Sequence, residues 1–200
     1  MSKKALIIID MQYDFLPGGA LAVENGDEII PVINRIQEDF DVVVATQDWH
    51  PEGHHSFASS HPGKNEFEVI TMNGQEQVLW PDHCVQGSRG AELSDAVDWR
   101  KVSAVFRKGM DPRVDSYSGF FDNNRKNSTG LSGYLQELDV SSIYVAGLAA
   151  DYCVYYTAKD GKELGFDTYY ILNATREISK DTYQAGLKDL ENKEVHLIEL

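Results

Sequence analysis

Six short, largely apolar runs recur along this chain, and within them apolar residues do not simply alternate with polar ones. They are Ala5–Ile9, Val42–Ala45, Val102–Phe106, Ile143–Ala146, Thr168–Leu172 and Val195–Ile198. This pattern is typical of strands that are covered on both faces. Amphipathic stretches of helical period separate several of the runs, at Glu28–Phe40, Leu131–Leu138, Tyr152–Leu164 and Thr182–Leu190. The alternation predicts an α/β fold, with an open, mostly parallel six-stranded sheet and helices on both of its faces.

The length of 200 residues predicts a single domain, residues 1–200. One segment, from about 50 to 99, breaks the alternation, because it is rich in glycine, proline, histidine and serine. It is too long for an ordinary connection, and long irregular insertions in compact domains usually carry function. We therefore expect a loop-rich insertion at about 50–99 that contributes to a binding site.

Charge and cysteine usage restrict the partners and the compartment. The formal net charge is −14 at pH 7, which disfavours nucleic acid and anionic membrane surfaces as partners. The only cysteines are Cys84 and Cys153, and the first apolar run is far too short for a secretion signal or a membrane span. These features predict a cytoplasmic protein with free thiols. A homo-oligomer is possible, and the sequence does not fix the oligomeric state.

Reactive side chains follow four of the predicted strands. Asp10 ends the first run, Asp48 and His50 follow the second, Lys108 follows the third, and Cys153 follows the fourth. Because ligands bind beyond the carboxyl ends of parallel strands, these residues should meet at one edge of the sheet. The chain lacks a GxGxxG fingerprint after the first strand, a complete P-loop and a GxSxG elbow, which argues against nucleotide binding and serine hydrolysis.

A cysteine nucleophile is one interpretation of this edge. Cys153 lies where a strand gives way to a segment of helical character, and a helix N-terminus favours a thiolate. The alternative is a small buried cysteine in a core helix. Asp10 at a strand end needs a cationic or hydrogen-bonding partner, and Lys108 is a candidate. Alternatively, Asp10 caps a turn and Lys108 is a solvated surface residue.

Histidines indicate a possible metal site. Five of the six lie between His50 and His83. The spacing of Asp48 and His50 allows both side chains to point the same way in an extended chain, and His83 follows the stiffening Pro81. One carboxylate with two or more imidazoles suits Zn²⁺, Fe²⁺ or Mn²⁺. The alternative is that these are polar loop residues.

Five ordered motifs resemble those of one enzyme family. They are the segments 8–15 (IIDMQYDF), 46–51 (TQDWHP), 80–85 (WPDHCV), 108–109 with 115–120 (KG and DSYSGF), and 147–154 (GLAADYCV). In this combination the chain resembles the nicotinamidases and pyrazinamidases of the isochorismatase-like cysteine hydrolase superfamily, nearly from end to end. Many relatives carry threonine where Ala150 stands here.

The resemblance implies a set of site residues. These are a catalytic triad of Asp10, Lys108 and Cys153, an oxyanion hole at Ala149 and Cys153, a substrate slot lined by Phe15, Trp80 and Tyr117, and metal ligands Asp48, His50 and His83, with His54, His55 or water as a possible fourth ligand. It also implies a cis peptide bond leading into Ala149.

The implied activity is hydrolysis of nicotinamide to nicotinate and ammonia, and of pyrazinamide to pyrazinoate, through a cysteine thioester in NAD salvage. The implied cofactor is one divalent metal ion, zinc foremost, with iron or manganese as alternatives. The partner is then a small-molecule substrate, nicotinamide. Two other hypotheses stay open from the residues themselves: a metalloamidase in which Cys153 is structural, and a non-catalytic binding module on the same scaffold.

Overall fold

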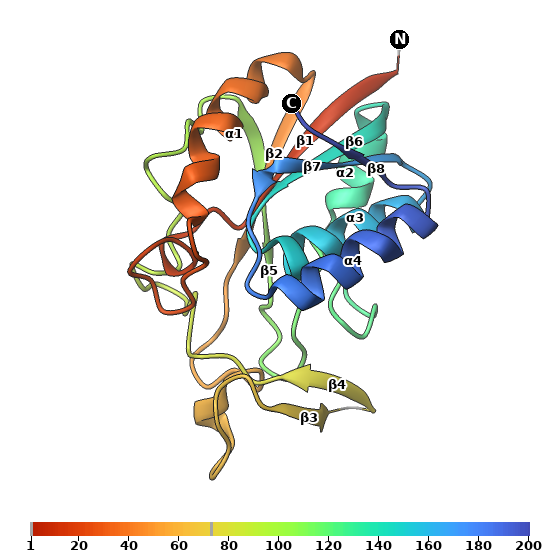
Figure 1. Ribbon diagram of the computed structural model, residues 1–200. Helices are drawn as coiled ribbons and strands as arrows, with labels where there is room; N and C mark the ends of the chain where they lie inside the picture. Colours follow the sequence, from red (N-terminus) through yellow and green to blue (C-terminus); the bar gives the residue numbers. More distant parts are fainter. Residues whose placement is uncertain (1, 73) are drawn as a thin grey trace.

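The computed structural model describes residues 2–72 and 74–200 (Figure 1). Its central sheet consists of β1 (Lys3–Ile9), β2 (Val42–Asp48), β5 (Val102–Lys108), β6 (Val140–Gly147), β7 (Asp167–Thr175) and β8 (His196–Ile198). The strand order is β5-β2-β1-β6-β7-β8, and every neighbouring pair is parallel. Each of the six apolar runs therefore forms a strand, and the predicted sheet is confirmed.

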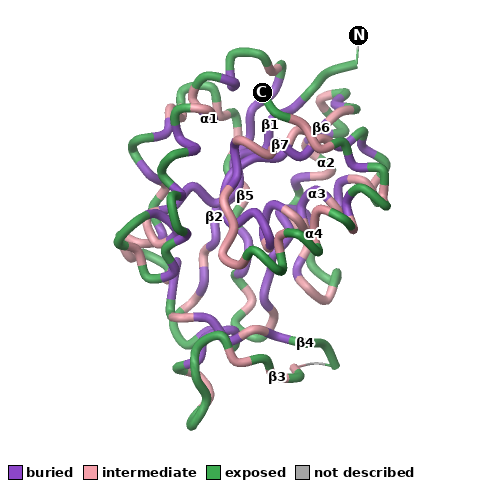
Figure 2. The backbone as a smooth tube through the Cα atoms, viewed as in Figure 1, coloured by how far each residue is buried: buried purple, intermediate pink, exposed green. Residues whose placement is uncertain are grey.

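Helices cover both faces of this sheet, as predicted. They are α1 (Ile30–Ile36), α2 (Leu131–Glu137), α3 (Tyr155–Glu163) and α4 (Lys180–Asn192). Leu6 and Ile8 of β1 join the apolar cluster that contains α1, whereas Ile7 and Ile9 join the cluster that contains residues of α2, α3 and α4. Successive side chains of a strand point to opposite faces, so one strand supplies both cores. Figure 2 shows the inner strands buried between these layers.

Two helical stretches differ from their predicted bounds. The stretch predicted as one helix, Glu28–Phe40, contains a 3-10 turn at Gly26–Ile29, α1, and a second 3-10 turn at Gln37–Asp39. Pro31 lies at the start of α1, where its missing N–H group costs no helical hydrogen bond. The stretch Tyr152–Leu164 begins with a π-helical turn at Ala150–Val154 before α3.

The insertion at about 50–99 contains little regular structure. A 3-10 turn spans Ala58–Ser60, and an antiparallel hairpin is formed by β3 (Val69–Met72) and β4 (Gln75–Val78). Figure 1 shows this hairpin at the end of the molecule away from the chain termini. Isolated backbone bridges join Phe57 to Trp80 and His50 to Val85. They connect the first part of the insertion to its middle, near the sheet edge. The division into a single domain stays a prediction.

The ends of β1 and β6 approach each other very closely. Ile9 pairs with Gly147 across the two strands, and a Cβ atom at Gly147 would lie 2.1 Å from the carbonyl oxygen of Ile9. Gly147 also has φ of 120°, a conformation that favours glycine. The peptide bond between Leu148 and Ala149 is cis, which confirms the cis bond that the family resemblance implies.

Candidate active site

The strand order creates a crevice at the end of β1. From β1 the chain adds β2 and β5 on one side of the sheet and β6, β7 and β8 on the other. Ligands of such open sheets bind beyond the carboxyl ends of the strands at this point of reversal. Asp10 directly follows β1, and Cys153 lies in the π-helical turn that follows β6. The sheet thus brings together two residues that are far apart in the sequence.

Lys108 lies at the centre of this crevice with its side chain fully buried. Its Nζ atom is 2.9 Å from Oδ2 of Asp10 and 2.8 Å from Oδ1 of Asp48. It also donates to the carbonyl oxygen of Ser116 at 2.9 Å and lies 3.5 Å from Sγ of Cys153. One oxygen of each carboxylate and the Cys153 sulfur all lie within 4.8 Å of one another. The structure therefore brings Asp10, Lys108 and Cys153 together.

Burial and charge act in opposite directions on these three groups. Burial alone would lower the pKa of Lys108, but the adjacent Asp10 and Asp48 outweigh it and hold that pKa well above its usual value. Burial raises the pKa of Asp10, partly opposed by Lys108. Burial likewise raises the pKa of the Cys153 thiol, again opposed by Lys108.

The sequence predicts that the helix N-terminus favours a Cys153 thiolate, whereas burial raises the pKa of this thiol in the pocket. Removal of the thiol from water outweighs the opposing charge of Lys108. A reaction at this sulfur needs a group that accepts its proton, and the carboxylate of Asp10 is within reach.

Thr46 fixes the position of the Asp10 carboxylate. Its hydroxyl donates to Oδ1 of Asp10 at 2.6 Å and accepts the backbone N–H of Asp10 at 3.2 Å. The other carboxylate oxygen is thereby left facing Lys108. Sequence reasoning missed Thr46, although its spacing of two residues from Asp48 in β2 places both on the same face of the strand.

A second cluster consists of Asp48, His50 and His83. The Nε2 atoms of His50 and His83 lie 3.5 Å and 4.0 Å from Oδ2 of Asp48. One ligand atom from each of the three residues falls within 4.8 Å of the others, and all three residues are buried. Two imidazoles and one carboxylate that converge in this way fit a divalent transition metal such as zinc.

Backbone carbonyl groups orient both imidazoles of this cluster. Nδ1 of His50 is 3.0 Å from the carbonyl oxygen of Gly109, and Nδ1 of His83 is 2.8 Å from that of Pro81. Such outer contacts place the proton on Nδ1 and leave Nε2 free as a ligand. Gly109 is needed here, because a Cβ atom at this position would lie 2.4 Å from the His50 ring.

The charges around the cluster suit a cation. Burial raises the pKa of Asp48, but Lys108 and His50 outweigh burial and hold it well below its usual value, so the carboxylate is ionised. Burial and the neighbouring His50 lower the pKa of His83 to about 4, so this imidazole is neutral at pH 7. Burial would lower the pKa of His50, yet Asp48 raises it overall. A carboxylate and a neutral imidazole are the forms that bind a metal.

The two histidines considered as a fourth ligand lie differently. His54 is buried, but its Nδ1 atom is 2.8 Å from the Ser56 hydroxyl and its Nε2 atom is 2.9 Å from the carbonyl oxygen of Asp111. His55 is exposed. Within the part of the chain that the structure describes, the cluster of potential ligands around Asp48 includes neither.

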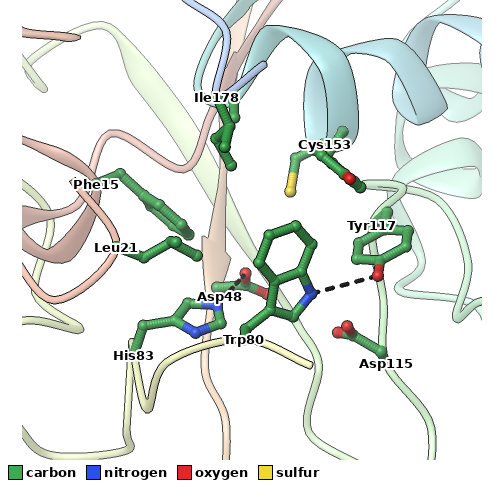
Figure 3. A pocket seen from close by; sticks show the side chains of 11 residues that line it. Phe15, Leu21, Asp48, Trp80, His83, Asp115, Tyr117, Cys153 and Ile178 are labelled. Atoms are coloured by element: carbon green, nitrogen blue, oxygen red, sulfur yellow. Dashed lines mark hydrogen bonds and ion pairs between the residues drawn. The ribbon is translucent and has the colours of Figure 1, made fainter. Parts of the chain in front are cut away.

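A pocket adjoins both clusters (Figure 3). The residues that line it are Phe15, Leu21, Asp48, Trp80, His83, Asp115, Tyr117, Ala149, Tyr152, Cys153 and Ile178. The Trp80 ring packs edge-on against Tyr152 and Tyr117, with centroids 4.8 Å and 6.3 Å apart, and Trp80 Nε1 donates to the Tyr117 hydroxyl at 3.3 Å. These flat aromatic walls suit a planar ring.

The predicted substrate residues Phe15, Trp80 and Tyr117 all line this pocket, as do Ala149 and Cys153. Sequence reasoning missed four lining residues: Leu21, Asp115, Tyr152 and Ile178. Tyr152 could have been found from its place beside Cys153. Ile178 lies shortly after β7, whose carboxyl end reaches the same edge of the sheet.

Comparisons with known proteins agree with this geometry. The Isochorismatase domain model matches residues 4–200. A nicotinamidase from Acinetobacter baylyi is 48% identical over 174 residues, which cover 87% of this chain and 81% of that protein.

Two solved structures are similar over almost the whole chain. The crystal structure of PnC1 from L. infantum in complex with nicotinate is 38% identical, with a TM-score of 0.87, and the match covers 99% of this chain and 93% of that one. The crystal structure of pyrazinamidase of Pyrococcus horikoshii in complex with zinc is 34% identical, with a TM-score of 0.81, and covers 99% of each chain.

Proposed function

Because the chain belongs to the isochorismatase family, we propose that it is an amidohydrolase that converts nicotinamide to nicotinate and ammonia. Pyrazinamide, whose ring is nearly isosteric, should be hydrolysed in the same way. The observation that carries this proposal is the aromatic pocket that adjoins Cys153, with Lys108 and Asp10 beside the sulfur. The relatives named nicotinamidase and the similar structure with bound nicotinate support it.

In the proposed reaction Cys153 is the nucleophile and Asp10 the general base. Sγ forms a bond to the amide carbon while its proton passes to the Asp10 carboxylate. Asp10 then gives this proton to the amide nitrogen, the carbon–nitrogen bond breaks, and ammonia leaves a thioester on Cys153. Water attacks the thioester carbon, loses a proton to Asp10, and nicotinate departs as the thiol is restored. Lys108 stabilises the negative charge that moves between carboxylate and sulfur.

The oxyanion of the tetrahedral intermediate is assigned to the backbone N–H groups of Ala149 and Cys153. Each such donor typically contributes on the order of 3 kcal/mol to transition-state stabilisation. Phe15, Trp80 and Tyr117 hold the ring flat, so attack on the amide becomes effectively unimolecular.

A divalent metal belongs to this proposal, held by Asp48, His50 and His83. When bound there, the ion supplies a Lewis-acid position for the ring nitrogen of the substrate. Zinc is proposed first, because the donor set suits it and the similar pyrazinamidase structure contains it, with iron or manganese as alternatives.

Setting and partners form the rest of the proposal. Among the described residues no helix is long and apolar enough to cross a membrane. We propose a cytoplasmic enzyme of NAD salvage whose partner is the small-molecule substrate, with no nucleic acid or membrane partner. The net charge of −14 supports this, and both cysteines are free thiols. A homo-oligomer stays compatible with the proposal.

Ammonia release from nicotinamide is the decisive test. The zinc-loaded protein should release ammonia, and Cys153→Ala should reduce the rate at least about 1,000-fold, since loss of a nucleophile leaves only binding and the oxyanion donors. Cys84→Ala, which removes the other thiol, should retain activity. A metalloamidase would retain most activity in Cys153→Ala, and a binding module would release no ammonia even as the metal-loaded wild type.

A further inference from the structure

The residues that line the pocket beside Cys153 differ in their exposure to solvent. Of the residues that line it, all are buried except Tyr152 and Ile178, which are partly exposed. Tyr152 and Ile178 are therefore the two lining side chains nearest to solvent. Figure 3 shows the Ile178 side chain pointing into the pocket on the side of Cys153, across the pocket from His83.

Ile178 also lines a second, more open cavity on its outer side. That cavity is polar, and its walls include Asn25, Arg176 and Lys180. Ile178 thus lies between a polar cavity and the aromatic pocket. A β-branched side chain is stiff about χ1, so its backbone position largely decides how far the passage is closed.

The carboxylate of Asp151 fixes that backbone position. Its Oδ1 atom accepts the N–H of Ile178 at 2.9 Å, and its Oδ2 atom accepts the N–H of Ser179 at 3.0 Å and the Thr182 hydroxyl at 2.5 Å. Asp151 is buried and lies two residues before Cys153 in the same π-helical turn. The preceding residue, Ala150, adds a backbone hydrogen bond to Arg176. The segment that carries Ile178 is therefore anchored directly to the turn that carries Cys153.

We propose that Tyr152 and Ile178 frame the entrance to the pocket, and that Asp151 is a positioning residue that sets the width of this entrance through Ile178. The entrance selects flat, narrow ring amides over bulkier ones. The identity of the entering molecule rests on the proposed function, whereas the entrance itself rests on exposure and hydrogen bonds alone.

Alkylation of Cys153 tests the entrance without any substrate. The rates of modification by iodoacetamide and by the bulkier N-ethylmaleimide are measured by mass spectrometry at one pH, with the buried Cys84 as an internal reference. Ile178→Ala should raise the N-ethylmaleimide rate and Ile178→Phe should lower it, each by about tenfold, the discrimination that one or two methylene groups confer in an apolar pocket. The proposal is overturned if both variants stay within about twofold of the wild type, since a rate-determining passage must respond to its own side chain.

Substitutions behind Ile178 test the positioning role. Asp151→Asn loses an acceptor for Ser179 and Thr182, so N-ethylmaleimide should react about tenfold faster relative to iodoacetamide, while kcat for nicotinamide should be little changed. Thr182→Val removes one of the three hydrogen bonds to Asp151 and should shift the ratio of the two alkylation rates less, in the same direction. This variant tests the positioning role if Asp151→Asn does not fold. Asp181→Asn is the matched control, because Asp181 carries the same charge as Asp151 but is exposed, next to Thr182 in the first turn of α4.

The outcomes separate this inference from the proposed function. An Asp151→Asn protein that behaves like Asp181→Asn overturns the positioning role. A wild type that releases no ammonia, while the alkylation rates shift as expected, overturns the proposed function and supports the entrance. Normal ammonia release by the wild type, with unchanged alkylation rates in both Ile178 variants, supports the proposed function and overturns the entrance.

Discussion

At the scale of single residues, the site depends on a lysine that keeps its charge without water. Transfer of an ammonium group into the interior costs several kcal/mol unless it is paired, and Lys108 has carboxylate oxygens at 2.8 Å and 2.9 Å. Two carboxylates so close together would repel each other without the lysine. Lys108 therefore offsets the repulsion between Asp10, the proposed base, and Asp48, the proposed metal ligand.

The pKa of Asp10 predicts the acidic limb of the pH–rate profile. Asp10 can accept the Cys153 proton only when it is ionised, and burial raises its pKa above the ordinary carboxyl value of 3.8, partly opposed by Lys108. We expect kcat/KM to fall as the pH drops through this raised pKa, and thus at a pH above 3.8. The measurement is kcat/KM for nicotinamide against pH, on protein kept metal-loaded.

The raised pKa of the Cys153 thiol leads to a second pH dependence, that of its alkylation, which serves as the control for the role of Asp10 as the base. Because burial raises its pKa well above the usual value, alkylation by iodoacetamide should still be increasing at pH 9. A plateau below pH 8 would mean that the thiolate is already stable in the resting enzyme, and Asp10 would not be needed as the base.

At the scale of secondary-structure elements, the paired ends of β1 and β6 determine the site. Gly147 leaves no room for a side chain, and we expect Gly147→Ala to destabilise the fold by roughly 2–4 kcal/mol through backbone displacement and the positive φ. Chemical denaturation measures this. Gly133→Ala in α2 is the control: it is exposed with open space around it, and should be neutral or stabilise by about 0.5–1 kcal/mol.

The elements were the most predictable part of the molecule. All six sheet strands were evident from their apolar runs, because burial on both faces leaves a direct compositional signal. The hairpin of β3 and β4 was not predicted, since both strands are partly exposed and carry no such run. Helix bounds shifted where Pro31 and the π-helical turn changed the local hydrogen bonding.

Site residues could be predicted from the sequence only where the side chain itself is chemically reactive. Asp10, Lys108 and Cys153 stood out because reactive groups after apolar strands are unusual, and the structure places them together. Ile178 and Leu21 carry no chemical signal, and their approach to the pocket depends on loop paths that periodicity does not describe. The resting state of the Cys153 thiol also escaped prediction, because burial is a property of the whole fold.

At the scale of the whole molecule, the insertion and the sheet together form the proposed metal site. His83 comes from the insertion, while Asp48 ends β2. A metal that binds only the folded protein should therefore stabilise it, by about 2.7 kcal/mol at a free concentration one hundred times Kd. For a domain of this size that corresponds to an increase in Tm of roughly 5–10 °C.

Thermal unfolding with and without Zn²⁺ checks this expectation. His83→Ala should lose most of the zinc-dependent increase in Tm. His61→Ala, which removes a histidine from the same insertion outside the Asp48 cluster, should retain it. An equal increase in both variants would place the binding site elsewhere, and chelation should abolish ammonia release only if the metal takes part in the reaction.

The strand order has a consequence for the time at which the enzyme becomes active. β1 is made first, yet its neighbour on the catalytic side is β6, and Cys153 follows later still. A growing chain on the ribosome can pair β1 with β2, and β2 with β5, long before that neighbour emerges. Such a nascent chain carries Asp10 and Lys108 but not the proposed nucleophile, so it should stay inert towards amides until translation has passed Cys153.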